Sequence, residues 1–223
     1  MDIFISPSSI GYIFAALVSW ISSWNLYRSY LSSKLEATRV FALAVLYIGT
    51  AMFFYALPTF FFAGVPEILG WFNVPANFLL GIGLAYLFRI AFLFNFQEKY
   101  AKFPFYLFVL YTIFIIVPIN IFYLPLPTFD KYNLEIWNYH NYLSYSISAM
   151  IVICTWSFSG SVWRYFFKRG TRTTITFPLA ASFTLGALGG IIIINADTTT
   201  AVIIGYLTLV LGGFVSFAFS FIR

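Results

Sequence analysis

Seven long apolar runs constrain the fold of this chain more than any other feature. Turn or charge signals separate them, and they cover residues 10–31, 40–62, 74–96, 103–123, 142–167, 175–195 and 200–222. Each run approaches or exceeds the about 20 residues that an α-helix needs to cross a bilayer. None shows the two-residue alternation of β-barrel strands. We therefore predict an all-α, polytopic membrane protein with seven transmembrane helices.

The charge content argues against a water-soluble fold. Only 9% of the residues are charged and 61% are hydrophobic, whereas soluble domains carry about 25% charged residues. The sequence has one cysteine and one histidine, which is too few for a disulfide scaffold or for a metal site built on several nitrogen or thiolate ligands. No nucleophile is accompanied by an evident base, so we expect no enzyme activity, no catalytic residue and no cofactor.

The basic residues predict the orientation in the cell membrane. Ten of the twelve flank alternate loops or the C-terminus: Arg28, Lys34, Arg39, Lys99, Lys102, Arg164, Lys168, Arg169, Arg172 and Arg223. Five of the seven acidic residues fall on the opposite side. Because basic loops stay in the cytoplasm, we predict an extracellular N-terminus and a cytoplasmic C-terminus. The net charge of +5 is then explained by topology and lipid headgroups, and no nucleic-acid partner is expected.

An internal similarity predicts a repeat within a single domain of residues 1–223. An offset of 136 residues overlays the first two runs on the fifth and sixth, and an offset of 124 relates the third to the seventh. The matched pairs include Trp20 with Trp156, Ser23 with Ser159, Arg28 with Arg164 and Gly81 with Gly205. The pattern predicts a 3+1+3 parallel repeat with halves 8–97 and 142–223 and a linker helix 103–124. Chance resemblance between apolar helices is the alternative.

Polar side chains within the runs are the first candidate ligand-binding residues. Asn77 and Asn120 need hydrogen-bond partners in hydrocarbon, so they either line a polar cavity or bridge helices. Tyr206 in the last run is a further candidate for a cavity. Arg89 is the charge that lies well inside a run, which favours either a functional site or a side chain that reaches the cytoplasmic headgroups. No acidic residue is expected at the depth of Arg89, so we predict no buried ion pair.

The longest polar segment, residues 125–141, adds Trp137 and His140 as candidates. Such a segment either caps a pocket that opens outward, with His140 titrating near neutral pH, or is a solvated loop with interfacial aromatic residues. A GxxxG spacing at Gly186 and Gly190 predicts close helix packing rather than chemistry.

The stretch 20–58 resembles a known family. A helix ends in Tyr27 and Arg28, a polar turn covers 32–37, and the next helix opens with the Thr-Arg-Val-Phe-Ala-Leu sequence of 38–43. This pattern is similar to the seven-helix membrane input region at the N-terminus of bacterial and archaeal histidine kinases. The resemblance implies an outside N-terminus and a C-terminus that leads to signalling domains. No kinase domain follows the last run, so the module is expected either to be separated from its kinase or to act alone.

Three functions remain open from the sequence. The first is a sensor or receptor-like module that binds a small uncharged or lipophilic ligand and signals to a cytoplasmic protein. The second is a small-solute transporter of 3+1+3 architecture, and the third is a non-catalytic subunit that assembles with other membrane subunits. All three share the lipid bilayer as a partner.

Cysteine labelling tests the predicted orientation. With Cys154 replaced by serine, we expect Lys34→Cys and Arg169→Cys to react with an impermeant thiol reagent from the cytoplasmic side, and Lys131→Cys from the outside. Reaction of the first two from opposite sides of the membrane would contradict the seven-span topology.

Overall fold

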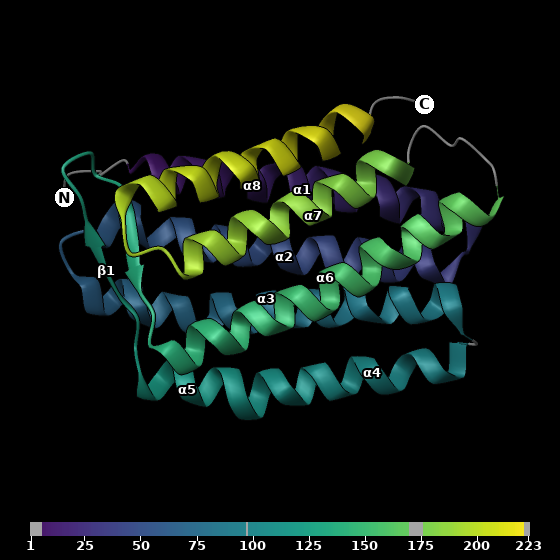
Figure 1. The fold of residues 1–223 in the computed structure, drawn as a ribbon, viewed down its shortest axis with the longest axis horizontal. Helices are drawn as coiled ribbons and strands as arrows, with labels where there is room; N and C mark the ends of the chain where they lie inside the picture. Colours follow the sequence, from purple (N-terminus) through teal and green to yellow (C-terminus); the bar gives the residue numbers. More distant parts are fainter. Residues whose placement is uncertain (1–5, 97, 170–175, 221–223) are drawn as a thin grey trace.

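Long helices make up most of the structure. The computed structural model describes residues 6–96, 98–169 and 176–220, with side chains described over 6–96, 98–164 and 180–215. The separate helices are α1 (Pro7–Ser33), α2 (Glu36–Phe62), α3 (Pro66–Asn95), α6 (Asn141–Arg169), α7 (Thr176–Ile194) and α8 (Thr199–Ser220) (Figure 1). One further helical rod joins α4 (Glu98–Tyr111), the π-helical turn η1 (Thr112–Ile116) and α5 (Val117–Phe122). The mainly helical fold predicted from the sequence is confirmed.

Four helices are long and apolar enough to cross a membrane. They are α2, α3, the rod Glu98–Phe122 and the Asn141–Arg164 part of α6, while Ala180–Ile194 and Thr199–Val215 are shorter apolar helices within the described residues. Several apolar helices of this length are the composition of a membrane-embedded protein. The number of spans and their orientation stay predictions.

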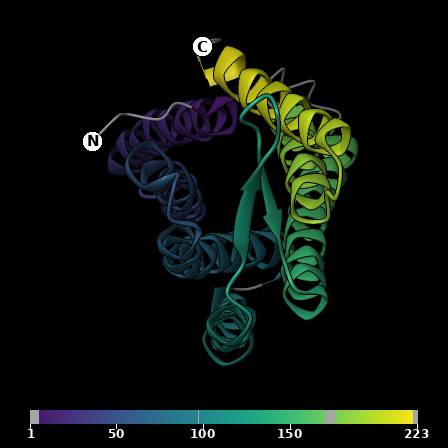
Figure 2. The ribbon, with the colours of Figure 1, turned by 90° about the vertical axis from the view of Figure 1, so that its left-hand side faces the viewer.

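Six of the helices form a closed ring, and the seventh rod lies outside it. Around the ring α1 packs on α2, α2 on α3, α3 on α6, α6 on α7 and α7 on α8, and α8 returns to α1 over a short stretch. The rod that contains α4 packs on the outer face of α3 (Figure 2). The ring therefore consists of two sequential triplets, α1–α3 and α6–α8.

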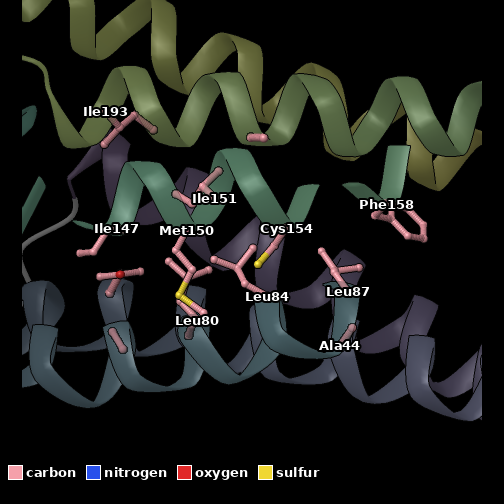
Figure 3. Close-up of a cluster of buried hydrophobic side chains, with 14 of the residues drawn as sticks. Ala44, Leu80, Leu84, Leu87, Ile147, Met150, Ile151, Cys154, Phe158 and Ile193 are labelled. Carbon is pink, nitrogen blue, oxygen red and sulfur yellow. The ribbon is translucent and has the colours of Figure 1, made fainter. Parts of the chain in front are cut away.

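The packing of α3 against α6 joins the two triplets on one side of the ring. Leu80, Leu84 and Leu87 of α3 lie opposite Met150 and Cys154 of α6, and all five are buried (Figure 3). In a bilayer this contact depends on van der Waals packing and not on the exclusion of water.

Two glycines make the same close contact in the two triplets. A Cβ atom on Gly83 of α3 would lie 3.1 Å from the carbonyl oxygen of Ala44 and from the backbone nitrogen of Ile48. A Cβ atom on Gly205 of α8 would lie at the same distance, 3.1 Å, from the corresponding atoms of Gly189 and Ile193 in α7. The glycine of the first triplet that packs as Gly205 does is therefore Gly83. Gly81, which the sequence offset pairs with Gly205, faces Thr112 of η1 instead. The repeat itself stays a prediction.

The close contact of α7 with α8 does not use the GxxxG pair as its contact face. A Cβ atom on Gly189 would lie 2.7 Å from backbone atoms of Gly205 and Leu209. A Cβ atom on Gly186 would meet nothing within 4 Å, and one on Gly190 would meet only Ile151, at 3.8 Å. The missing side chains of Gly186 and Gly190 therefore do not make this contact, but the backbone of Gly186 does take part in it, because a Cβ atom on Gly212 of α8 would lie 2.9 Å from the Gly186 nitrogen.

A β-hairpin crosses one end of the ring where the sequence predicted only a loop. Strands β1 (Leu126–Phe129) and β2 (Glu135–Asn138) pair antiparallel, with Phe129 opposite Glu135. Viewed from this end, the hairpin lies across the opening between the two triplets (Figure 2). Because alternate residues of a strand share a face, Glu135 and Trp137 point the same way, and both are buried. We call this the hairpin end of the bundle; the all-α expectation needs this one correction.

Two glycine substitutions one turn apart on α7 test the packing. Gly189→Ala is expected to destabilise the protein by about 1–3 kcal/mol, because the added methyl group meets the α8 backbone and cannot displace it cheaply. Gly186→Ala should be neutral or stabilise by up to about 1 kcal/mol, since the methyl group enters open space and alanine favours the helix. Thermal unfolding in detergent measures both, and equal losses would contradict the assignment of the contact face.

Candidate functional site

A cavity of about 580 Å³ lies inside the ring, and all six ring helices contribute to its wall. Its apolar part includes Ile48, Met52, Leu80, Leu84, Ile151 and Leu209. Gly186, Gly190 and Gly212 also line it, and the missing side chains of Gly186 and Gly190 leave the space open. The volume falls in the range of about 300–1,000 Å³ that is typical of small-molecule sites.

One face of α1 gives the cavity a polar strip. Ser19, Ser22, Asn25 and Ser29 all line it, and their spacing of three or four residues places them on one side of the helix. The strip runs along α1 away from the hairpin end.

Aromatic hydroxyl groups line the hairpin end of the cavity. Tyr12 of α1, Tyr55 of α2 and Tyr139, which follows β2, form part of its wall. The Tyr12 ring lies 5.4 Å from the Tyr55 ring and 5.2 Å from the ring of Tyr206 in α8, measured between centroids. The tyrosines thus bring together the first and last helices of the ring at one end of the cavity.

A chain of amides extends from these tyrosines into α3 and α5. The Tyr55 hydroxyl donates to Asn77 Oδ1, and Asn77 Nδ2 donates to Asn73 Oδ1. Asn73 Nδ2 donates to the Tyr139 hydroxyl at 2.8 Å, and Asn120 Nδ2 donates to Asn73 Oδ1 at 3.4 Å. The network satisfies groups that would be costly to leave unpaired in an apolar interior and connects α2, α3, α5 and the segment after the hairpin.

Glu135 is a fully buried carboxyl group on the hairpin. Its Oε1 accepts a hydrogen bond from the Thr59 hydroxyl at 3.2 Å, and its backbone N–H donates to Ser8 Oγ at 3.1 Å. Its Oε2 is buried without a hydrogen-bond partner. Burial raises the pKa of Glu135 to about 8. The Thr59 hydroxyl and the Trp137 indole, which is near but makes no hydrogen bond, act in the opposite direction and lower the pKa by less than burial raises it. The group is therefore largely protonated at neutral pH.

Hydrogen bonds attach the hairpin to both triplets. Ser6, the N-cap of α1, donates from Oγ to the carbonyl oxygen of Asn133 at 2.8 Å. Thr199 at the start of α8 donates from Oγ1 to Asp130 Oδ2 at 2.8 Å. Together with Thr59 of α2, these contacts hold the hairpin across the opening between the first and last helices.

Four of the six predicted ligand-binding residues gather at the hairpin end. Asn77 and Asn120 belong to the amide network, Trp137 lies 6.0 Å from Tyr139 between ring centroids, and Tyr206 packs on Tyr12. Their role in ligand binding stays a prediction. The arrangement excludes the alternative in which segment 125–141 is a fully solvated loop, since Glu135 and Trp137 are buried.

The other two predicted residues lie elsewhere. His140 is exposed and stacks on Tyr123, with ring centroids 4.0 Å apart. Arg89 Nη2 lies 2.9 Å from Glu36 Oε1, which also contacts Arg39 Nη2 at 2.7 Å. Arg89 therefore has an acidic partner that the sequence did not identify, because its long side chain reaches the first turn of α2. The pair is partly exposed, so the prediction of no buried ion pair is not contradicted.

Two residues at the hairpin end, Asn73 and Glu135, were not identified from the sequence. Asn73 and Asn77 are four residues apart on one helix, and this spacing could have identified Asn73 as a partner. No sequence pattern identifies Glu135, because an acidic residue between turn-forming residues is normally expected to be exposed to solvent. Among the described residues, no group of three or more His, Cys, Asp or Glu side chains could hold a metal ion.

Comparison with known proteins gives no relative: no protein-family model, no curated protein and no solved structure matches the chain.

The stability of the protein should depend on pH through Glu135. Between about pH 4.5 and pH 8 the folded protein retains a proton that the unfolded chain has lost, so stability falls as pH rises through this window and levels off above it. The loss amounts to a few kcal/mol, at about 1.4 kcal/mol per pH unit. Thermal unfolding in detergent from pH 5 to 9 measures it.

Glu135→Gln should remove this slope, because the amide does not ionise. Glu67→Gln, which changes an exposed acid at the start of α3, is the matched control and should retain it. An unchanged slope in Glu135→Gln would assign the pH dependence to other groups.

Proposed function

We propose that the chain is a seven-span module of the cell membrane, with its N-terminus outside, that binds a small, mainly apolar ligand in the central cavity and acts as a receptor. The observation that carries this proposal is the cavity itself, which combines an apolar wall with hydroxyl and amide groups at defined places. Sites for small molecules have this composition: apolar surface supplies affinity, and a few polar groups orient the ligand.

The tyrosine and amide network offers a route from ligand to helix position. Tyr55 lines the cavity and also bonds to Asn77, so a ligand that contacts its hydroxyl competes directly with a bond between α2 and α3. A ligand shifts a conformational equilibrium by its difference in affinity for the two states. The resemblance of residues 20–58 to kinase input regions supports the same function, with a cytoplasmic signalling protein as the partner.

Transport of a small solute is the second candidate. The observation that favours it is the place of the cavity between two triplets of matching order, α1–α3 and α6–α8, with equivalent glycine contacts at Gly83 and Gly205. Transporters built from repeats carry their substrate at such an interface.

Filling the cavity should abolish binding. Gly186→Phe places a ring in the open space next to this residue, and we expect it to weaken the binding of a neutral amphiphile such as 2-phenylethanol at least tenfold. Leu188→Phe adds an aromatic ring at an exposed position of the same helix and should bind like the wild type. Ligand-observed NMR in detergent measures both, and equal binding by the two variants would refute the cavity as the site.

Flux measurements separate the two candidates. A receptor should bind 2-phenylethanol analogues in proteoliposomes without counterflow, whereas a transporter should exchange a labelled, membrane-impermeant solute across the bilayer. If counterflow occurs and Gly186→Phe abolishes it, the protein would be a transporter and not a receptor.

A further inference from the structure

Glu135 has no basic partner among the described residues. The ion pairs of the described part join Glu36 to Arg39 and Arg89 at the other end of α2. The carboxyl group is fully buried, its Oε1 has only a neutral partner, Thr59, and its Oε2 has none. A buried carboxyl group is normally paired, coordinated or protonated, and Glu135 has no positive partner in the part of the chain that the structure describes.

Glu135 Oε2 is one of several buried polar atoms without a hydrogen-bond partner among the described residues. Asn120 Oδ1 is a second acceptor in this state, and the Ser9 and Tyr206 hydroxyl groups can donate or accept. The donor-only atoms are Trp137 Nε1 and Arg89 Nε, the latter on the residue that pairs with Glu36. Because an unpartnered buried carboxyl oxygen is costly, Glu135 Oε2 suits a ligand group that donates a hydrogen bond.

Aromatic rings separate the carboxyl group from the cavity. Tyr12, Tyr55 and Tyr139 line the hairpin end of the cavity, and the Glu135 carboxyl lies within electrostatic range of Tyr12, Tyr139 and Tyr206. Tyrosine faces attract cations through their π-electrons, by up to about 2 kcal/mol or more when the cation is desolvated. Rings backed by an acid form a setting that favours an organic ammonium group over a neutral head group.

We propose that the ligand of the central cavity is an amphiphilic organic ammonium ion, with its apolar body between the two triplets and its N–H groups directed at the tyrosines and Glu135. This inference rests on the proposed function and specifies its ligand class. The ammonium ion then supplies the positive partner that Glu135 lacks among the described residues.

Binding then releases a proton. The neutral Glu135 carboxyl group loses its proton to solvent when the ammonium ion arrives, and the bound state holds a carboxylate beside R–NH₃⁺. Burial favours the neutral acid in the free protein, so affinity for the ammonium ion should rise from pH 6 to pH 8.5. Among the described residues, the other titratable groups that interact with Glu135 are the phenols of Tyr12 on α1, Tyr206 on α8 and Tyr139. Ordinary phenols titrate near pH 10, as do primary amines.

An isosteric pair of probes tests the inference. Binding of 2-phenylethylammonium and of 2-phenylethanol is measured by ligand-observed NMR at pH 8.5 for the wild type, Glu135→Gln and Glu67→Gln. We expect the wild type and Glu67→Gln to prefer the ammonium ion about tenfold or more. Glu135→Gln should lose that preference and bind the alcohol within twofold of the wild type.

The outcomes distinguish the two proposals. Binding of the alcohol without preference for the ammonium ion would overturn the ligand class and leave the cavity site intact, whereas no binding of either probe would overturn both. If NaCl competes with the ammonium probe more strongly in the wild type than in Glu135→Gln, the site would be assigned to an inorganic cation instead.

Calorimetry of the wild type gives a test that needs no variant. Titration of 2-phenylethylammonium at pH 6.5 in two buffers with different ionisation enthalpies should show release of about one proton per bound ligand, and titration of 2-phenylethanol should show none. Equal proton release for both probes, or none for the ammonium ion, would overturn the inference.

Discussion

Packing between the two helical triplets is extensive where α3 meets α6 and short where α8 meets α1, and this uneven packing leaves room for the cavity. Leu80, Leu84 and Leu87 of α3 meet α6 in a continuous buried seam, while α1 and α8 touch over a short stretch. The second side is closed by the ring contacts of Tyr12 with Tyr206 and of Phe14 with Phe214. The hairpin, which bonds to Ser6 and Thr199 at the two helix starts, adds a bridge at one end. A bundle packed this unevenly retains internal space that a uniformly packed bundle would lose.

The glycines of α7 serve two purposes: one allows close packing on α8, and the others leave space in the cavity. Gly189 allows the backbone of α8 to approach, and Gly186 and Gly190 leave space on the cavity side. Small residues on two sides of one helix keep it close to its neighbour and also keep the cavity open. A sequence pattern that reports only spacing cannot separate these roles, because both require the absence of a side chain.

The helices were predictable from sequence, and the ring and hairpin were not. Apolar runs such as 40–62 identify helices because length and hydropathy are local properties. The partner of Arg89 was missed because Glu36 is distant in sequence and lies in a polar turn. Glu135 was missed because two strands of four residues each give too short an alternation to reveal a buried face. Asn77, Asn120, Trp137 and Tyr206 were selected by residue type, and the fold then places them together.

The network of Tyr55, Asn77, Asn73, Tyr139 and Asn120 consists of phenol and amide groups, none of which carries a formal charge. A membrane potential performs work only on charge that moves through the field, about 2.3 kcal/mol per elementary charge per 100 mV. Rearranging these bonds therefore involves almost no electrical work. The exchange of these hydrogen bonds would by itself proceed equally in energised and de-energised cells.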